Sequence, residues 1–100
     1  MITAFIKKPG VPGTVEIIDA SLDSLQKIVG GYIEAVYIDD FALVVNEEGV
    51  LKGLPYNAHV SGYDLVGTII VMRAGDEDFE AITPEDVPII RAMFETTVAH

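Results

Sequence analysis

The sequence has 100 residues, half of them hydrophobic, and no cysteine, so it can bury one core but has neither disulfides nor thiolate ligands. Its 16 acidic and 6 basic residues give a formal net charge of −10. This disfavours binding to nucleic acid or to a lipid membrane, because both require clustered Lys and Arg. The longest apolar run, Leu65 to Met72, is far shorter than the roughly 20 residues of a membrane span, and the N-terminus lacks a signal-peptide pattern. We therefore expect a single soluble, cytoplasmic domain over residues 1–100.

The N-terminal third predicts a hairpin followed by a helix. Ile2–Lys7 and Thr14–Ile18 are typical of strands, and the KPGVPG between them contains two turn signals. Ser21 can cap a helix over residues 21–29, whose apolar residues recur at helical spacing. Gly30 can take the left-handed conformation that ends helices. Because the glycines follow the helix, they do not form a phosphate-binding loop.

The middle of the chain predicts an antiparallel meander. Tyr32–Ile38 and Phe41–Val45 are expected to be strands joined by a turn at the DD pair. NEEG then turns into a short strand, Val50–Lys52, with Gly49 supplying a positive φ. The following segment, GLPYNAHVSGYD, spreads Gly, Pro, Asn and Ser over its length and predicts an irregular crossing.

The last third predicts a central strand, an edge strand and a closing helix. LVGTIIVMRAG is apolar on both faces, which places it in the interior of the sheet. A short edge strand is expected around Phe79, and a helix over residues 86–97. If Thr83 caps this helix and Pro84 is its first residue, Pro88 removes one backbone hydrogen bond. The alternative is a separate turn over residues 83–86, with the regular helix beginning near Pro88.

The order of these elements predicts an α+β fold. We expect a mainly antiparallel sheet of about five strands with both helices packed on one of its faces. Leu25 and Phe94 lie in the apolar stripes of the two helices and are expected in the core.

Few residues suggest catalysis. His59, Ser61 and Asp64 lie close in sequence, but triads are assembled by long-range geometry, and such a group is typical of a polar loop. DEDFE opens like a calcium loop, yet Ala81 and Val87 stand where that loop requires Gly and Glu. Nucleotide-loop and zinc-protease motifs are also missing. We expect no enzyme, no metal site and no cofactor, and a small hydrolase is only the third hypothesis.

The stretch NEEGVLKGLPYN, from Asn46 to Asn57, has two interpretations that the sequence leaves open. It can be a turn and a corner, in which Asn57 makes a hydrogen bond that holds the chain. It can also be a binding surface, because carboxylates, amides and tyrosines suit contacts with a protein or a planar ligand. In that case the candidate binding residues are Asn46, Glu47, Glu48, Tyr56, Asn57 and His59.

The motifs VGGYIE and NEEGxLxGLPxN are the most specific part of a pattern that spans nearly the whole chain. By this pattern the sequence resembles a family of small proteins of unknown function encoded mainly by bacteriophages, plasmids and their bacterial hosts. The resemblance implies a setting in mobile genetic elements and supplies no catalytic residues. Its signature falls on Gly30, Gly31, Tyr32, Ile33, Glu34, Asn46, Glu47, Glu48, Gly49, Leu51, Gly53, Leu54, Pro55 and Asn57.

We therefore expect an accessory protein that acts by binding. In the leading hypothesis, its acidic face contacts an unidentified protein with a basic surface and modulates a host protein or defence system, although acidity alone also serves solubility. The alternative is a small-molecule, nucleotide-like binding or sequestering module. The sequence leaves a homo-oligomer open. The candidate cations for an anionic ligand are Lys7, Lys8, Lys52 and Arg73.

Overall fold

The computed structural model describes residues 1–95 of the chain. This range contains eight strands and two helices. In chain order they are β1 (Ile2–Lys7), β2 (Thr14–Ile18), α1 (Leu22–Val29), β3 (Ile33–Ile38), β4 (Phe41–Asn46), β5 (Tyr56–Val60), β6 (Tyr63–Val66), β7 (Ile69–Ala74), β8 (Phe79–Glu80) and α2 (Asp86–Glu95).

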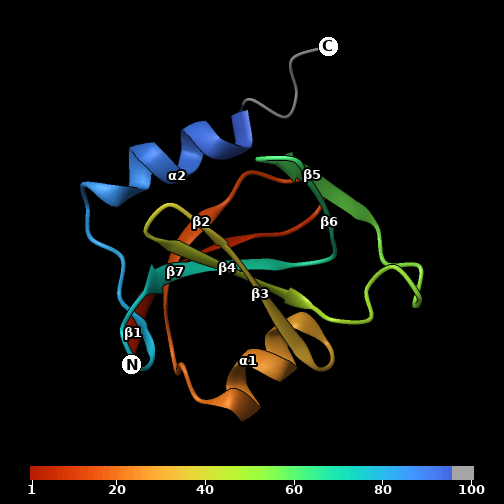
Figure 1. Ribbon diagram of the computed structural model, residues 1–100, viewed down its shortest axis with the longest axis horizontal. Helices are drawn as coiled ribbons and strands as arrows, with labels where there is room; N and C mark the ends of the chain where they lie inside the picture. Colours follow the sequence, from red (N-terminus) through yellow and green to blue (C-terminus); the bar gives the residue numbers. More distant parts are fainter. Residues whose placement is uncertain (96–100) are drawn as a thin grey trace.

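Six strands form one sheet, in the order β2-β1-β7-β4-β3, with β8 paired to the end of β7 (Figure 1). Every pairing in it is antiparallel, and β5 and β6 form a separate antiparallel pair. The predicted α+β class, the antiparallel sheet and the central place of Ile69 and Ile70 are confirmed, since both side chains are completely buried. Neither helix within residues 1–95 is long and apolar enough to cross a membrane.

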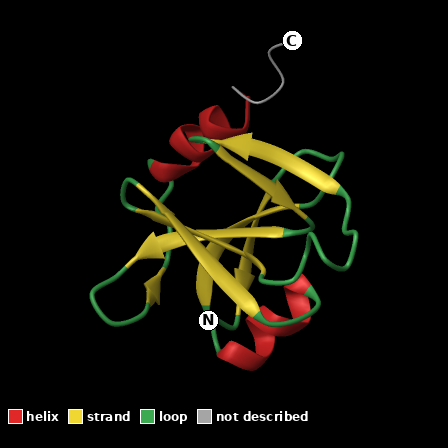
Figure 2. Cartoon of the chain, turned by 45° about the vertical axis from the view of Figure 1, so that its right-hand side comes forward, coloured by secondary structure: helices red, strands yellow, loops and turns green. Residues whose placement is uncertain are grey.

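The two helices pack on opposite faces of the sheet, so the expectation that both cover one face is wrong. On β4, Leu43 lies in a core cluster with Ile90 of α2, whereas its neighbour Val44 lies in a second cluster with Leu25 of α1. Successive side chains of a strand point to opposite faces, and all of β4 is buried, so each face needs its own cover. Figures 1 and 2 show α2 and the β5–β6 hairpin on one side of the sheet and α1 on the other.

The segment after β4 differs from the prediction in three places. The expected strand Val50–Lys52 is absent, because residues 47–53 form consecutive turns. The expected irregular crossing is instead the β5–β6 hairpin. Its two-residue turn consists of Ser61 and Gly62, with φ of 48° and 86°, the combination of positive angles that suits tight hairpins. Gly67, with φ of 73°, then separates β6 from β7, so Leu65 and Val66 belong to the hairpin and not to the central strand that was expected to include them.

Helix α2 begins at Asp86, and the described residues follow it to Glu95, so residues 96 and 97 of the predicted helix lie outside them. The alternative of a turn before the helix is confirmed, since the Asp86 backbone N–H donates to the Thr83 carbonyl oxygen. Pro88 falls in the first helical turn, where a backbone N–H has no partner within the helix and its loss is tolerated.

Candidate functional site

The side chain of Asn46 is buried and connects two parts of the backbone, so it is not part of an exposed binding surface. Asn46 ends β4, and only 5% of it is exposed. Its side-chain Nδ2 donates to the carbonyl oxygen of Val29 at 3.2 Å, and its Oδ1 accepts from the backbone N–H of Glu48 at 2.8 Å. A Cβ on Gly31 would lie 2.9 Å from the same Nδ2. The VGG and NEEG motifs therefore meet in space, around one amide.

Glu47 and Glu48 are exposed, as a partner-binding surface requires. The Glu47 backbone N–H donates to the carbonyl oxygen of Tyr32 at 2.8 Å, which fixes the backbone and leaves the carboxylate free to turn outward. The Oε1 of Glu48 lies 3.9 Å from the Nζ of Lys52, which is four residues further along the chain, and both side chains are nearly half exposed. Such a surface pair contributes little to stability.

Gly49 is needed for a close contact and not for a positive φ, so the expectation for its backbone is wrong. A Cβ at this position would lie 2.7 Å from the Cγ2 of Val66, which brings the turn against β6. The positive angle occurs instead at Gly53, with φ of 68°.

Asn57 ties the hairpin to the main sheet. Its Nδ2 donates to the carbonyl oxygens of Lys7, at 2.8 Å, and Gly67, at 2.7 Å. Its Oδ1 accepts from the Lys7 Nζ at 3.2 Å. The pairing of β5 with β6 shifts register between Tyr56 and Ala58, which places Asn57 in the irregularity. Both donors of the amide are therefore used within the fold.

His59 and Tyr56 both contact Asp64 across the hairpin. The His59 Nδ1 lies 2.8 Å from the Asp64 Oδ1, and the Tyr56 hydroxyl donates to the same oxygen at 3.3 Å. The hydrogen bond with His59 lowers the pKa of Asp64, while partial desolvation and then the Asp64 charge raise the pKa of Tyr56. Within residues 1–95, no hydrogen bond joins Ser61 to His59, and the three residues do not form a triad.

A small hollow beside the NEEG turn is lined by both acidic and apolar residues. Its volume is about 160 Å³, and we call it the acidic hollow. Asn46 and Glu47 of the predicted site line it, whereas Glu48, Tyr56, Asn57 and His59 do not. Three carboxylates and three buried apolar side chains contribute to its wall: Glu34, Glu47, Asp64, Val36, Val45 and Leu65.

A larger cavity opens on the other strand of the hairpin, between β5, α2 and the β1–β2 loop. Its volume is about 540 Å³, and we call it the basic cavity. Lys7 and Arg91 supply its cations and Glu95 an acid, while much of the remaining wall is apolar, including Phe5 and Phe94. Of the six candidate binding residues only Asn57 lines it, and of the four candidate cations only Lys7 does.

The fold and both recesses lie within residues 2–95, and these residues match the family described as Domain of unknown function (DUF3846). The chain belongs to this family. No curated protein and no solved structure matches the chain. The DUF3846 match confirms a family of unknown function, as the resemblance implied, and leaves the chemistry of the two recesses to be argued from their side chains.

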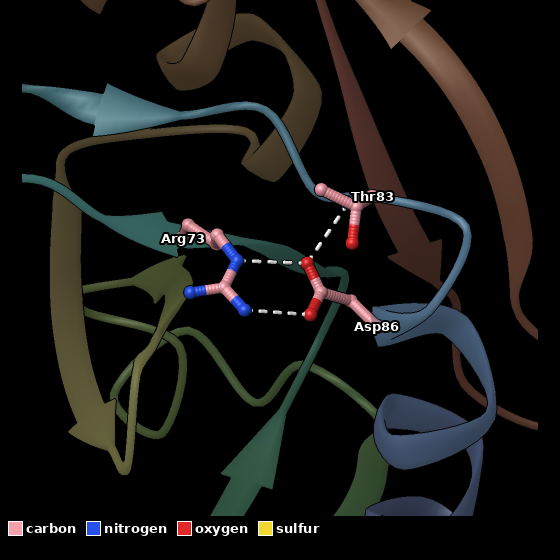
Figure 3. Close-up of polar contacts among 3 residues, drawn as sticks. All are labelled: Arg73, Thr83 and Asp86. Carbon is pink, nitrogen blue, oxygen red and sulfur yellow. Dashed lines mark hydrogen bonds and ion pairs between the residues drawn. The ribbon is translucent and has the colours of Figure 1, made fainter.

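Arg73, expected as a cation for an anionic ligand, is engaged inside the DUF3846 fold. Its Nε and a terminal nitrogen donate to the two carboxylate oxygens of Asp86, each at 2.8 Å (Figure 3). The Thr83 backbone N–H donates to the same carboxylate at 2.8 Å. The hydrogen bonds from Arg73 lower the pKa of Asp86 to about 2, although burial opposes the shift. The pair joins β7 to the start of α2.

Arg91 was not among the expected cations, although its side chain lines the basic cavity of this DUF3846 domain. Arg91 follows the buried Ile90 and therefore lies beside the apolar stripe of α2. The helical period of the sequence is enough to predict this position. The sequence does not predict the opposite wall of the cavity, because the β1–β2 loop and α2 are far apart in the sequence and meet only in the folded chain.

Proposed function

We propose that this protein acts by binding and not by catalysis, and that its acidic hollow receives a basic side chain of a partner protein. The observation that carries this proposal is the composition of the hollow, whose wall combines the carboxylates of Glu34, Glu47 and Asp64 with apolar side chains. A Lys or Arg side chain has the matching chemistry, because its apolar stem can contact the wall while its charged end meets the carboxylates.

The overall charge of the protein supports a basic partner. A net charge of −10 on 100 residues attracts a positively charged surface over a distance and accelerates its association. The hollow then gives this attraction a defined place, since both Glu34 and Glu47 are exposed and neither belongs to an ion pair within the described residues.

The proposed setting is a bacteriophage or another mobile genetic element. There the protein would be an accessory factor in the host cytoplasm that modulates a host protein or defence system. Membership in a family of unknown function is compatible with this setting. The sequence motifs that suggest it, VGGYIE and NEEG, are the ones that build the wall of the hollow at Glu34, Asn46 and Glu47.

The test is retention of a partner from bacterial lysate, followed by titration of the purified partner at increasing salt. The variant Glu34→Gln/Glu47→Gln removes two charges from the hollow. We expect it to weaken binding by about tenfold or more and to reduce the dependence of the affinity on salt. The matched control is Glu77→Gln/Glu85→Gln, which removes two exposed acids that do not line the hollow.

Equal affinity of the partner for the wild-type protein and the hollow variant would contradict the proposal. The same holds if the control variant loses as much affinity, because net charge alone would then explain the binding. The nucleotide-like alternative is favoured by a different observation, the pair of cations in the basic cavity, and a small hydrolase remains third.

A further inference from the structure

The basic cavity contains cations that the fold leaves without carboxylate partners. Within residues 1–95 there are three ion pairs, and neither Lys7 nor Arg91 takes part in them. Of the six Lys and Arg residues, which all lie within residues 1–95, only Lys52 and Arg73 have an acidic partner within 4 Å. Lys7 and Arg91 differ from the other unpaired bases because both line the same cavity, where one anion could meet two cations.

Lys7 is held in place with part of its hydrogen-bonding capacity unused. Its Nζ donates to the carbonyl oxygen of Lys8 at 2.9 Å and to the Asn57 Oδ1 at 3.2 Å. An ammonium group has three protons, so one remains for a ligand. Burial lowers the pKa of Lys7, which means that its charge is poorly compensated by the surroundings.

Arg91 is oriented by the opposite wall of the cavity. Its guanidinium carbon lies 5.2 Å from the centre of the Phe5 ring, and one terminal nitrogen donates to the carbonyl oxygen of Gly13 at 3.1 Å. Phe5 in turn stacks on Phe94, with 5.9 Å between the ring centres. A planar cation is thus held beside aromatic side chains, and its other N–H groups can bind an anion.

The size and wall of the cavity suit a small organic molecule. Its volume of about 540 Å³ falls within the range of about 300–1,000 Å³ that is common for ligand pockets. Such pockets are mostly apolar, with a few polar groups that orient the ligand, and here the groups with hydrogen-bonding capacity left for a ligand are Lys7 and Arg91.

We propose that the basic cavity binds a small organic anion with a flat apolar ring, with its anionic group between Lys7 and Arg91 and its ring against the apolar wall. An aromatic carboxylate and a nucleoside monophosphate share this chemistry. The inference does not rest on the acidic hollow, which is lined from β6 whereas the cavity is lined from β5. The proposed function of the acidic hollow and the proposed ligand of the basic cavity can therefore be disproved independently.

The test uses three probes on the full chain: 1-naphthoate, adenosine monophosphate and inorganic phosphate. Calorimetry gives the affinity and stoichiometry, and amide NMR shifts give the location. We expect at least one ring-bearing probe to bind once per chain and to shift the amides of Val11, Ala58 and Arg91, while phosphate binds at least about tenfold more weakly. Binding of 1-naphthoate alone identifies a carboxylate ligand, and binding of the nucleotide alone a phosphate ligand.

Single substitutions in the cavity sharpen the test. Lys7→Gln and Arg91→Gln should each weaken the probe that binds by about tenfold or more, because each removes a charged donor. Glu95→Gln should strengthen it, since it removes a negative charge from the wall. The matched control is Lys27→Gln, an exposed lysine of α1 outside the cavity, which should change the affinity by less than about twofold.

Three results would overturn the proposal. One is that neither ring-bearing probe binds at millimolar concentration. Another is that Lys27→Gln weakens binding as much as Lys7→Gln does. The third is that the cavity amides shift on concentrating the protein without a probe, which would show that a second copy fills the cavity. If a urea titration shows that Arg91→Gln is unfolded, the affinity of Lys7→Gln for the probe alone tests the role of the cations.

Discussion

The side chain of Asn46 donates a hydrogen bond to the carbonyl oxygen of Val29, which joins the end of β4 to the end of α1. The carbonyl groups in the last turn of a helix lack partners within the helix, so this amide satisfies one of them. Two parts of the sequence that lie 17 residues apart are thereby fixed to each other.

Asn46→Ala is expected to lower the free energy of unfolding by about 1–3 kcal/mol, because it leaves buried backbone groups without a partner. Gly31→Ala should also destabilise the protein, since its Cβ would lie 2.9 Å from the Asn46 amide, which is fixed, and 2.8 Å from the Nζ of Lys52, an exposed side chain that can move away. In the Asn46→Ala background this second cost should largely disappear. Urea titrations of the two single variants and the double variant measure the coupling, and additive costs would contradict it.

Glu47→Gln and Glu48→Gln are expected to leave stability within about 0.5 kcal/mol of the wild type, because both carboxylates are exposed and the turn depends on backbone bonds. The same urea titrations provide the measurement. A loss of more than about 1 kcal/mol in either variant would show that the charges have a structural role. The folded variants can then report on binding without a stability correction.

Asn57→Ala is expected to lower the free energy of unfolding by about 1–3 kcal/mol, because the side-chain amide donates hydrogen bonds to the carbonyl oxygens of Lys7 and Gly67. The loss should be accompanied by faster hydrogen exchange in the β5–β6 hairpin, since Asn57 links it to β1. Tyr56→Phe is the control on the same strand, as it removes only an exposed hydrogen bond. If Asn57→Ala and Tyr56→Phe have equal, small effects, the amide does not anchor the hairpin.

Local signals predicted most elements of the fold. The cap at Ser21, the end of α1 at Gly30 and the strand at Phe79 all depend on residues close in sequence, and all are present in the structure. The β5–β6 hairpin was missed because the polar residues around it outweighed one short turn signal. That signal was the Ser61–Gly62 pair between two alternating runs, and it was available in the sequence.

The arrangement of layers and the sites depended on long-range contacts that a single sequence does not contain. The strand β4 is apolar on both faces, a pattern that predicts burial but does not say which helix covers which face. The candidate site shows the same limit. The motif identified Asn46 as a candidate, but the motif does not show that its side chain is buried and donates to the carbonyl oxygen of Val29 at the end of α1. The basic cavity likewise depends on a contact between Arg91 and Gly13, which are 78 residues apart in the sequence.

The opposite positions of the helices predict that core substitutions beneath them act independently. Leu25→Ala should cost about 2–5 kcal/mol and Ile90→Val about 0.5–1.5 kcal/mol, because both side chains are buried. They belong to separate core clusters on the two faces, so their costs should add within about 0.5 kcal/mol. Urea titration of the double variant measures the sum, and a large coupling would indicate that the two helices share one core.

The ion pair of Arg73 and Asp86 predicts a loss of stability in acid. Its hydrogen bonds lower the pKa of Asp86 from 3.8 to about 2 in the folded protein, so the folded state favours the ionised carboxylate. That stabilisation is complete above the pKa of the unfolded state and is lost as the pH falls from about 4 towards 2. At pH 7, Asp86→Asn should lower the free energy of unfolding by about 1–3 kcal/mol, because it weakens hydrogen bonds to a charged group.

The decisive measurement is the difference in stability between the wild type and Asp86→Asn at pH 7, 4, 3 and 2. Other carboxylates also titrate over this range, but they contribute equally to both proteins and cancel in the difference. We expect the difference to be constant from pH 7 to about pH 4 and to shrink below it, because only the wild type can take up a proton at Asp86. Glu85→Gln, an exposed neighbour, should follow the wild type throughout. A difference that stays constant down to pH 2 would show that the Asp86 charge does not stabilise the start of α2.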